Sequence, residues 1–270
     1  MFWCLHVLPK NIKSKEPCKE IFNFQYRLYN LNKLIRILFL AAFISITDNC
    51  FATWSIIILD PLTKEIGIAG ASCSYSVYGI GGIIPGKGAI VAQAMSNMKA
   101  KQKGMEMIRA GNDPEEILYT IIDPSFDPAS NLQQYGIVCF NYLTKPVNFT
   151  GSSTPPSSGS YTADGISVQG NTLANDHVLK AVFDTVIAAR KNGLSIREIL
   201  IRALKAGSEA GGDVRCAKQK ASSAFITVMK AADDVRKPYL NLFISGIGRG
   251  GNNAVDVLAG MYSKWERYHR

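Results

Sequence analysis

From position 53 onward, the pattern of hydrophobic and polar residues predicts alternating groups of strands and helices. Runs rich in β-branched and aromatic residues that end at turn residues, such as the run before Asp60-Pro61, are typical of strands. Such runs predict strands over residues 53–59, 65–72, 89–94, 135–142, 147–150, 225–230 and 240–245. The first two lie close enough in sequence to form a hairpin, and strand-like residues also resume at Ile166.

Apolar residues at helical spacing predict five helices between these strands. Asp113 before Pro114 is a typical helix start, and Gly111 is a typical stop. The helices are predicted over residues 95–110, from 113 onward, and over 175–191, 194–210 and 253–268. Grouped rather than strictly alternating elements favour an α+β class. We interpret the Ser-, Gly- and Pro-rich residues 150–164 as a surface loop within one domain; an interdomain linker is the alternative.

Residues 1–52 have a different pattern, which predicts a signal peptide with a long basic region. An apolar run of ten residues, 37–46, follows a basic flank. After it comes Cys50-Phe51-Ala52, which has small residues at its first and third places, as a cleavage site does. The run is too short to span a bilayer, which needs about 20 apolar residues. Cleavage after Ala52 would leave one domain, residues 53–270, exported to the periplasm or secreted. An uncleaved anchor helix is the alternative.

Removal of this leader also changes what the composition indicates. The 270 residues are 47% hydrophobic and 19% charged, which is typical of a globular protein. Of the net charge of +9, the leader carries seven basic and three acidic residues, so +5 remains on residues 53–270. The sequence contains no basic stripe interleaved with aromatic residues, so it does not predict a nucleic-acid partner. Cys73, Cys139 and Cys216 remain, which allows one disulfide and leaves its pairing open.

Motifs for cofactors and metals are incomplete in this sequence. Residues 81–87 resemble a phosphate-binding loop, but Gly88 stands where Ser or Thr would hold magnesium. Residues 246–251 match G-x-G-x-x-G, yet the chain lacks the following strand with an acidic residue, so a strand–helix connection is the better interpretation. His177 and His269 are the only histidines after the leader. We therefore predict neither a cofactor nor a metal site.

Cleavage after Ala52 would make Thr53 the first residue of the exported chain. An N-terminal Thr carries both a nucleophile and a base, because its α-amine can accept the proton of its hydroxyl. An α-amine titrates near about 7.7–8.0, so a useful fraction is neutral at physiological pH. Thr53 also begins a predicted strand, which would hold the hydroxyl on a rigid element. The alternative is that a small polar residue follows the cut by chance.

Short sequence blocks, in a fixed order from Thr53 to about Ser245, carry a family resemblance. The strongest are 168–174 (VQGNTLA) and 211–215 (GGDVR). The others are 53–56 (TWSI), 67–72 (GIAGAS), 83–85 (IIP), 88–89 (GA), 93–94 (QA) and 135–138 (YGIV). In these blocks the chain resembles the family filed as domain of unknown function 1028 (DUF1028), which is grouped with the N-terminal nucleophile (Ntn) hydrolases.

The resemblance implies a four-layer αββα sandwich, in which two antiparallel sheets lie between helical layers. It also implies an amidohydrolase or peptidase activity on C–N bonds, with a small-molecule or peptide amide as substrate. In that family the Thr commonly follows the initiator Met, whereas here a signal peptide would deliver it. A non-catalytic exported binding or structural protein on the same fold is the alternative. Whether the protein forms a homo-oligomer stays open.

Around a nucleophilic Thr53, acyl transfer needs donors for the oxyanion and groups that bind the substrate. Asn171 and the backbone of Gly170 are candidate oxyanion donors, because they follow a β-rich run. Their alternative role is in a turn. Asp213 and Arg215 are candidates for binding a substrate carboxylate or amine, since the Arg fork suits a carboxylate. A structural ion pair is the alternative there.

Three further polar residues complete the predicted site. Lys87, just before the third predicted strand, could lower the barrier at Thr53 electrostatically, although a loop lysine is more often exposed to solvent. Ser72 and Gln93 could line the site, and both could instead be ordinary polar residues of strands.

Overall fold

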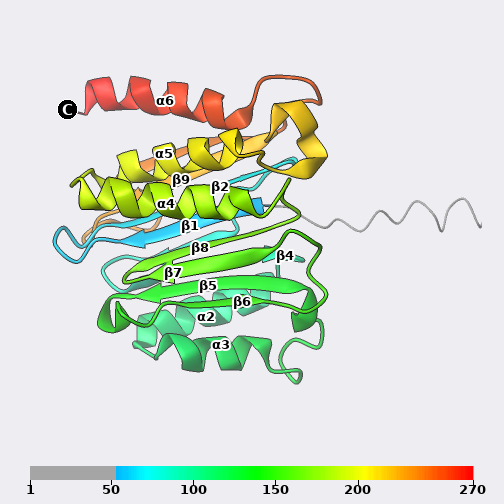
Figure 1. The fold of residues 1–270 in the computed structure, drawn as a ribbon. Helices are drawn as coiled ribbons and strands as arrows, with labels where there is room; N and C mark the ends of the chain where they lie inside the picture. The colour runs from blue at the N-terminus through cyan, green and yellow to red at the C-terminus, as the bar shows by residue number, and fades with distance from the viewer. Residues whose placement is uncertain (1–52, 270) are drawn as a thin grey trace, which may run out of the picture. The chain divides into compact units, whose positions relative to one another are not determined.

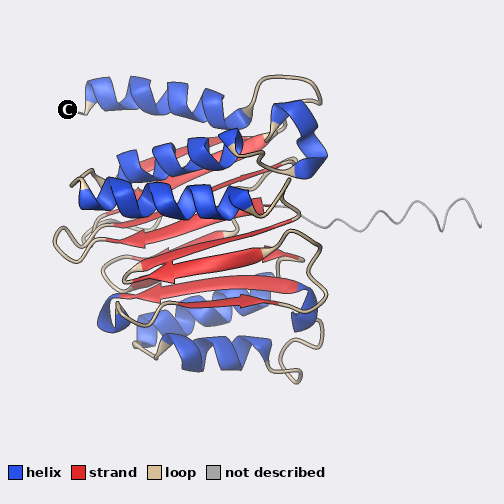
Figure 2. Ribbon diagram, viewed as in Figure 1, coloured by secondary structure: helices blue, strands red, loops and turns tan. Residues whose placement is uncertain are grey.

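Two antiparallel sheets form the centre of the computed structural model, which describes residues 53–269 (Figures 1 and 2). The predicted leader lies outside the described residues. Strand order in the larger sheet is β10 (Leu240–Ile244), β9 (Ser223–Met229), β2 (Ile66–Ser72), β1 (Thr53–Leu59), β8 (Ile166–Asn171) and β7 (Gly159–Ala163). The smaller sheet runs β3 (Gly81–Ile84), β4 (Gly88–Ala94), β5 (Gln133–Cys139) and β6 (Val147–Thr150).

Helices cover the outer face of each sheet, as Figure 2 shows. One group lies over the larger sheet and comprises α4 (His177–Lys191), α5 (Ile196–Glu209) and α6 (Ala254–Tyr268). The other lies over the smaller sheet and comprises α2 (Met98–Ala110) and α3 (Pro114–Ile122). The predicted α+β class with antiparallel sheets in a single domain is confirmed. Within the described residues, no helix is long and apolar enough to cross a membrane.

Alternation along β1 distributes its side chains between two apolar layers. Trp54 and Ile56 belong to the hydrophobic cluster beneath α4 and α5, whereas Ile57 and Leu59 belong to the cluster between the two sheets. A third cluster, which includes Ile90 and Ile117, lies between the smaller sheet and helices α2 and α3. Because side chains of a strand alternate between faces, Thr53 and Ser55 also lie on the face of β1 that meets the smaller sheet.

Helix starts and stops follow the predicted chemistry closely. Asp113 accepts a hydrogen bond from the backbone N–H of Glu115, and Gly111 ends α2 in the left-handed conformation with φ +90°. The predicted helix over 95–110 begins later than expected, at Met98, because the Asn97 side chain caps it. The loop over residues 246–251 connects β10 to α6, as predicted.

The sequence pattern missed two strands, and it predicted one strand that is longer than the strand in the structure. The interpretation of residues 150–164 as a loop is wrong in part, because they include β7, an edge strand with mostly exposed side chains and therefore no hydrophobic alternation. Strand β3 was missed because it begins with Gly81-Gly82, a pair that is typical of a turn. The glycine at position 82 serves packing instead, since a Cβ there would come within 2.4 Å of the Met105 sulfur. Residues 140–142 form a 3-10 turn, so β5 ends at Cys139.

Gly136 on β5 offers a test of how tightly the sheets meet. A Cβ at this position would lie 2.3 Å from Gln169 Oε1 and 2.5 Å from Ser167 Oγ, both buried between the sheets. We expect Gly136→Ala to lower the free energy of unfolding by about 1–3 kcal/mol through overpacking, measured by urea denaturation.

Gly260→Ala is the matched control, because Gly260 lies in α6 with open space around its Cβ position. There the same substitution should be neutral or stabilise by up to about 1 kcal/mol through helix propensity. Equal stability of Gly136→Ala and the wild type would contradict the described packing of the sheets.

Candidate active site

Thr53 is the first residue of β1 and lies at the end of the larger sheet, between two neighbouring strands. Its register partners are Ser72, the last residue of β2, and Asn171, the last residue of β8. The Thr53 side chain is only 1% exposed. Three residues that sequence reasoning assigned to one site are therefore brought together by the antiparallel register of β1 with its two neighbours.

A cavity of about 320 Å³ opens beside Thr53. The segment of residues 73–80, which follows β2, forms one wall, and the end of β4 with the start of α2 forms the other. The lining residues carry no charged side chain: Thr53, Ser74, Ser76, Val77, Tyr78, Gly79, Ile80, Gln93, Ala94, Ser96 and Met98. The predicted site residue Gln93 is among them, so the structure gives Thr53 a pocket lined by hydroxyl, amide and apolar groups.

A chain of hydrogen-bonded, buried amide and hydroxyl side chains lies beside Thr53 and connects the larger sheet to the smaller one. The Gln93 Nε2 donates to Gln134 Oε1 at 2.7 Å, and it lies 3.4 Å from the Thr53 carbonyl oxygen. Asn171 Nδ2 donates to the same Gln134 Oε1 at 3.1 Å. Ser55 Oγ donates to Gln93 Oε1 at 2.6 Å. We call the five residues Ser55, Gln93, Gln134, Gln169 and Asn171 the polar seam.

Gln169 extends the polar seam along β8. Its Nε2 donates to Ser55 Oγ at 2.6 Å, and Gln134 Nε2 donates to the Gly170 carbonyl at 2.9 Å. All five seam residues are essentially inaccessible to solvent. Buried polar groups destabilise a fold unless they are hydrogen-bonded, so this reciprocal pairing is what allows them to lie between the sheets. Of the five, sequence reasoning identified Gln93 and Asn171 and missed the other three.

The two candidate oxyanion donors have different surroundings. Asn171 places its amide at the end of β8 beside Thr53, where the side chain is already oriented by Gln134. Gly170 is a strand residue between β1 and β7. Its N–H therefore points along the sheet toward a neighbouring strand and not into the pocket. A Cβ on Gly170 would approach the Thr53 carbonyl to 3.0 Å, so the glycine serves close packing.

Two residues next to Thr53 have left-handed backbone conformations. Ala94 at the end of β4 has φ +66°, and Thr172 directly after Asn171 has φ +52°. Such conformations are unfavourable for a residue with a Cβ, most of all for a β-branched one such as Thr172. Strained backbone concentrates at functional sites. Both strained residues lie at the edge of the site that contains Thr53.

Ser72 belongs to a small hydroxyl cluster on the other side of Thr53. Its Oγ lies 2.9 Å from Ser74 Oγ and accepts the backbone N–H of Ser74 at 3.0 Å. Ser222 donates its hydroxyl to the Ser74 carbonyl at 2.9 Å. Ser74 lines the Thr53 cavity and was missed by sequence reasoning, because a single Ser in a loop has no distinguishing pattern.

Asp213 and Arg215 form an ion pair behind the segment that follows Ser72. Asp213 is fully buried; its Oδ1 accepts from Arg215 Nε at 3.1 Å and its Oδ2 from Arg215 Nη2 at 2.8 Å. Asp213 Oδ2 also accepts the Cys73 N–H at 2.6 Å. Cys73 also forms a disulfide with Cys216, so these two cysteines are the pair. The third cysteine, Cys139, is a buried free thiol, and burial raises its pKa to about 12. Asp213 therefore positions its neighbours, the structural role that the sequence left open.

Lys87 is placed away from the other predicted site residues, which corrects its proposed role at Thr53. It lies in the turn before β4 and donates to the Arg109 carbonyl, whereas Gln93 is near the other end of that strand. Six strand residues at about 3.3 Å each separate them by roughly 20 Å. The sequence could not reveal this, because a lysine beside a strand can lie at either end of the sheet relative to Thr53.

A different lysine, Lys101, contacts the wall of the Thr53 pocket. It projects from α2, is only 7% exposed and donates its ammonium to the carbonyl of Gly79, a pocket residue. Burial lowers the pKa of the Lys101 amine below its usual range. Sequence reasoning missed it, because Lys99 to Lys103 resembles a solvent-exposed basic face.

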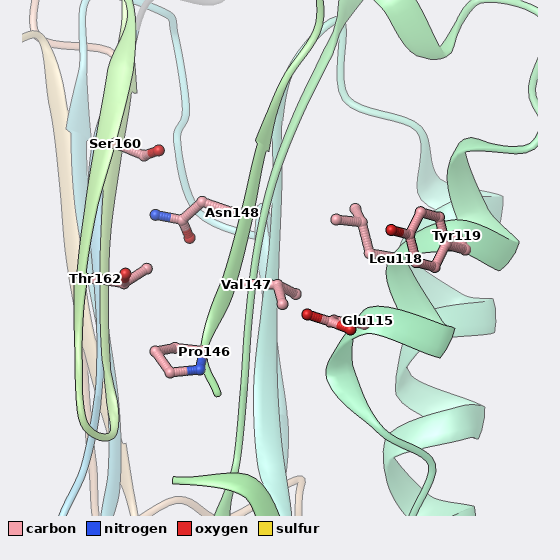
Figure 3. Close-up of a pocket in the computed structure, with 8 residues that line it drawn as sticks. All are labelled: Glu115, Leu118, Tyr119, Pro146, Val147, Asn148, Ser160 and Thr162. Atoms are coloured by element: carbon pink, nitrogen blue, oxygen red, sulfur yellow. The ribbon is translucent and has the colours of Figure 1, made fainter. Parts of the chain in front are cut away.

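A separate cavity of about 370 Å³ lies at the edge strands β6 and β7 and contains none of the predicted site residues (Figure 3). In Figure 3, Asn148 of β6 extends toward Ser160 and Thr162 of β7, whereas Glu115 and Tyr119 of α3 lie on the opposite side of β6. This cavity is separate in its lining from the Thr53 pocket. In the described part of the chain, no three His, Cys, Asp or Glu residues are grouped to hold a metal ion.

Comparison with known proteins identifies relatives over most of the chain. A family model described as a family of unknown function, DUF1028, matches residues 53–246, so the match begins at Thr53. The crystal structure of a DUF1028 protein from Silicibacter pomeroyi is similar, with a TM-score of 0.66 and 26% identity. The match covers 79% of this chain and 85% of that one. No curated protein matches the chain.

The pH dependence of stability tests the placement of Lys101. Because burial lowers its pKa in the folded state, the unfolded chain binds more protons between that lowered pKa and the ordinary lysine pKa of about 10.4. The free energy of unfolding of the wild type, relative to Lys101→Met, should therefore rise with pH as the pH approaches the ordinary lysine pKa of about 10.4. Denaturation at each pH measures it.

Lys99→Met is the matched control, because Lys99 is an exposed lysine on the same helix. Its stability difference from the wild type should stay nearly constant over the same pH range. A constant difference for Lys101→Met as well would mean that Lys101 is solvated, contrary to its described position.

Proposed function

The chain belongs to DUF1028, and from that premise we propose that it is an exported Ntn hydrolase that cleaves amide bonds with Thr53 as nucleophile. In this proposal, residues 1–52 are a signal peptide, and its removal after Ala52 creates the α-amine of Thr53. The two sheets with helices on their outer faces would then be the αββα sandwich of that superfamily. The proposed substrate is a small-molecule or peptide amide.

The observation that carries the proposal is the position of Thr53. The residue that the predicted cleavage would place first opens a central strand, at the wall of a cavity of about 320 Å³ and among buried amide donors. A first residue without a role needs no such rigid surroundings. A nucleophile does, because its attack depends on a fixed position relative to the substrate carbonyl.

The proposed reaction proceeds in two steps. Thr53 Oγ1 attacks the amide carbonyl carbon while its hydroxyl proton passes to its own α-amine. The C–N bond then breaks, the leaving amine takes that proton, and an ester links the acyl group to Thr53. Water attacks the ester, with the α-amine again as base, which releases the acid and restores the hydroxyl. Asn171 is the side chain best placed to donate to the oxyanion.

The proposed processing is tested by determining the first residue of the exported protein. Expression of the full chain in a bacterial host with a secretory pathway should give a product whose N-terminal sequence is Thr-Trp-Ser. A product that starts at any other residue would remove the α-amine from Thr53 and contradict the proposed mechanism.

The proposed nucleophile is tested with an electrophilic β-lactone probe on the processed protein. We expect acyl labelling of the wild type, slower labelling of Thr53→Ser and a loss of at least 100-fold in Thr53→Ala, followed by intact mass. The labelling rate should rise with pH through about 7.7–8.0, as the α-amine becomes neutral. Thr63→Ala is the control, because the Thr63 hydroxyl lies in an exposed turn on Asp60.

Labelling of Thr53→Ala at the wild-type rate would identify another nucleophile. Absence of labelling in every protein, with the Thr-Trp-Ser start intact, would favour the alternative of a non-catalytic binding protein.

A further inference from the structure

We propose that a second pocket, on the other side of residues 73–76 from Thr53, binds a small carboxylate ligand that carries a flat apolar group. This cavity measures about 320 Å³ and is lined by Arg215, Arg249 and Tyr75, together with the Cys73–Cys216 disulfide and the first part, residues 246–249, of the glycine-containing loop. The inference does not depend on catalysis by Thr53.

The two pockets use opposite faces of one loop segment, residues 73–76. Ser74 and Ser76 line the Thr53 cavity, whereas Cys73 and Tyr75 line the second cavity. The segment therefore separates an uncharged pocket from a basic one. Among the described residues that line the second cavity, the charged ones are Arg215 and Arg249, and none is acidic. That charge distribution favours an anion over a cation or a neutral amide.

Arg215 is fixed before any ligand arrives. Asp213 holds its guanidinium through two hydrogen bonds of 2.8 and 3.1 Å, and the disulfide anchors the neighbouring Cys216. Because Asp213 neutralises Arg215, the charge of the exposed Arg249 is left to set the potential of the cavity. Arginine binds carboxylates with well-defined geometry, which favours this ligand class.

The loop that carries Arg249 is also held in place. Gln219 Nε2 donates to the carbonyls of Gly248 at 3.1 Å and Asn252 at 3.2 Å. These two acceptors, which would repel an anion, are therefore already engaged. Backbone bonds from Gly246 N to Tyr75 O and from Ile247 N to Ser222 O fasten the start of the loop. The G-x-G-x-x-G pattern thus forms an anchored wall and not a dinucleotide-binding turn.

Tyr75 supplies the apolar part of the proposed site. Its side chain is 81% exposed, yet it packs on Gly246, where a Cβ would come within 2.7 Å of the ring. Gly246 has φ +69°, which favours glycine at this contact. An exposed aromatic ring that lines the same cavity as the Arg249 guanidinium matches a ligand with a planar apolar body and a carboxylate.

The proposal is tested by titrating the full chain with benzoate and with inorganic phosphate in isothermal calorimetry at low salt. We expect saturable benzoate binding that is tighter than phosphate binding. Arg249→Ala should weaken benzoate binding at least tenfold, and Arg249→Lys should weaken it less. Arg202→Ala, which removes an exposed arginine of α5, is the matched control and should leave benzoate binding unchanged.

A Tyr75→Ala variant separates the two parts of the site, since it should weaken benzoate binding and leave phosphate binding unchanged. Thr53→Ala should bind benzoate like the wild type, which keeps this test independent of the proposed nucleophile. Equal benzoate affinity in Arg249→Ala and the wild type, tighter binding of phosphate than of benzoate, or no saturable binding at millimolar benzoate would each overturn the proposal.

Discussion

Burial of a polar seam between two apolar sheets is the constraint on which the site depends. Ser55, Gln93, Gln134, Gln169 and Asn171 are inaccessible to solvent, and each is hydrogen-bonded to another member of the seam. Unpaired, such groups would each cost about 1–3 kcal/mol, so the pairing tolerates little displacement of one sheet against the other. A one-residue slip of β1 would turn Ser55 toward the helices and Trp54 into the seam. The seam therefore fixes the position of Thr53.

A second set of contacts ties the loop beside Thr53 to a distant part of the chain. Asp213 binds the Cys73 N–H and the Arg215 guanidinium, and the disulfide joins the same two segments covalently across 143 residues. A buried carboxylate is tolerated because these donors compensate for its lost hydration. The loop after β2 thus forms a rigid partition with a different pocket on each face.

Most of the fold could be predicted from the sequence, because most strands and helices carry strong local signals. Capping residues such as Asp113 and the β-rich run Thr53–Leu59 report directly on local structure. The family blocks also grouped Thr53 with Asn171, which the register of β1 with β8 makes neighbours. Edge strand β7 was missed because exposure removes the hydrophobic signal. Lys87 was wrongly assigned to the site and Lys101 was missed, because only tertiary packing decides which lysine approaches the pocket.

The alternation of β1 also limits where a productive cleavage can fall. Trp54 is fully buried on the helix side, where a Cβ on Gly207 would come within 2.6 Å of its Nε1. A cut one residue later would therefore leave a first side chain on the wrong face of the sheet. A cut one residue earlier would leave Thr53 without an α-amine of its own. In the proposed mechanism, nucleophile, base and strand register coincide at a single peptide bond, so processing and catalysis depend on the same residue.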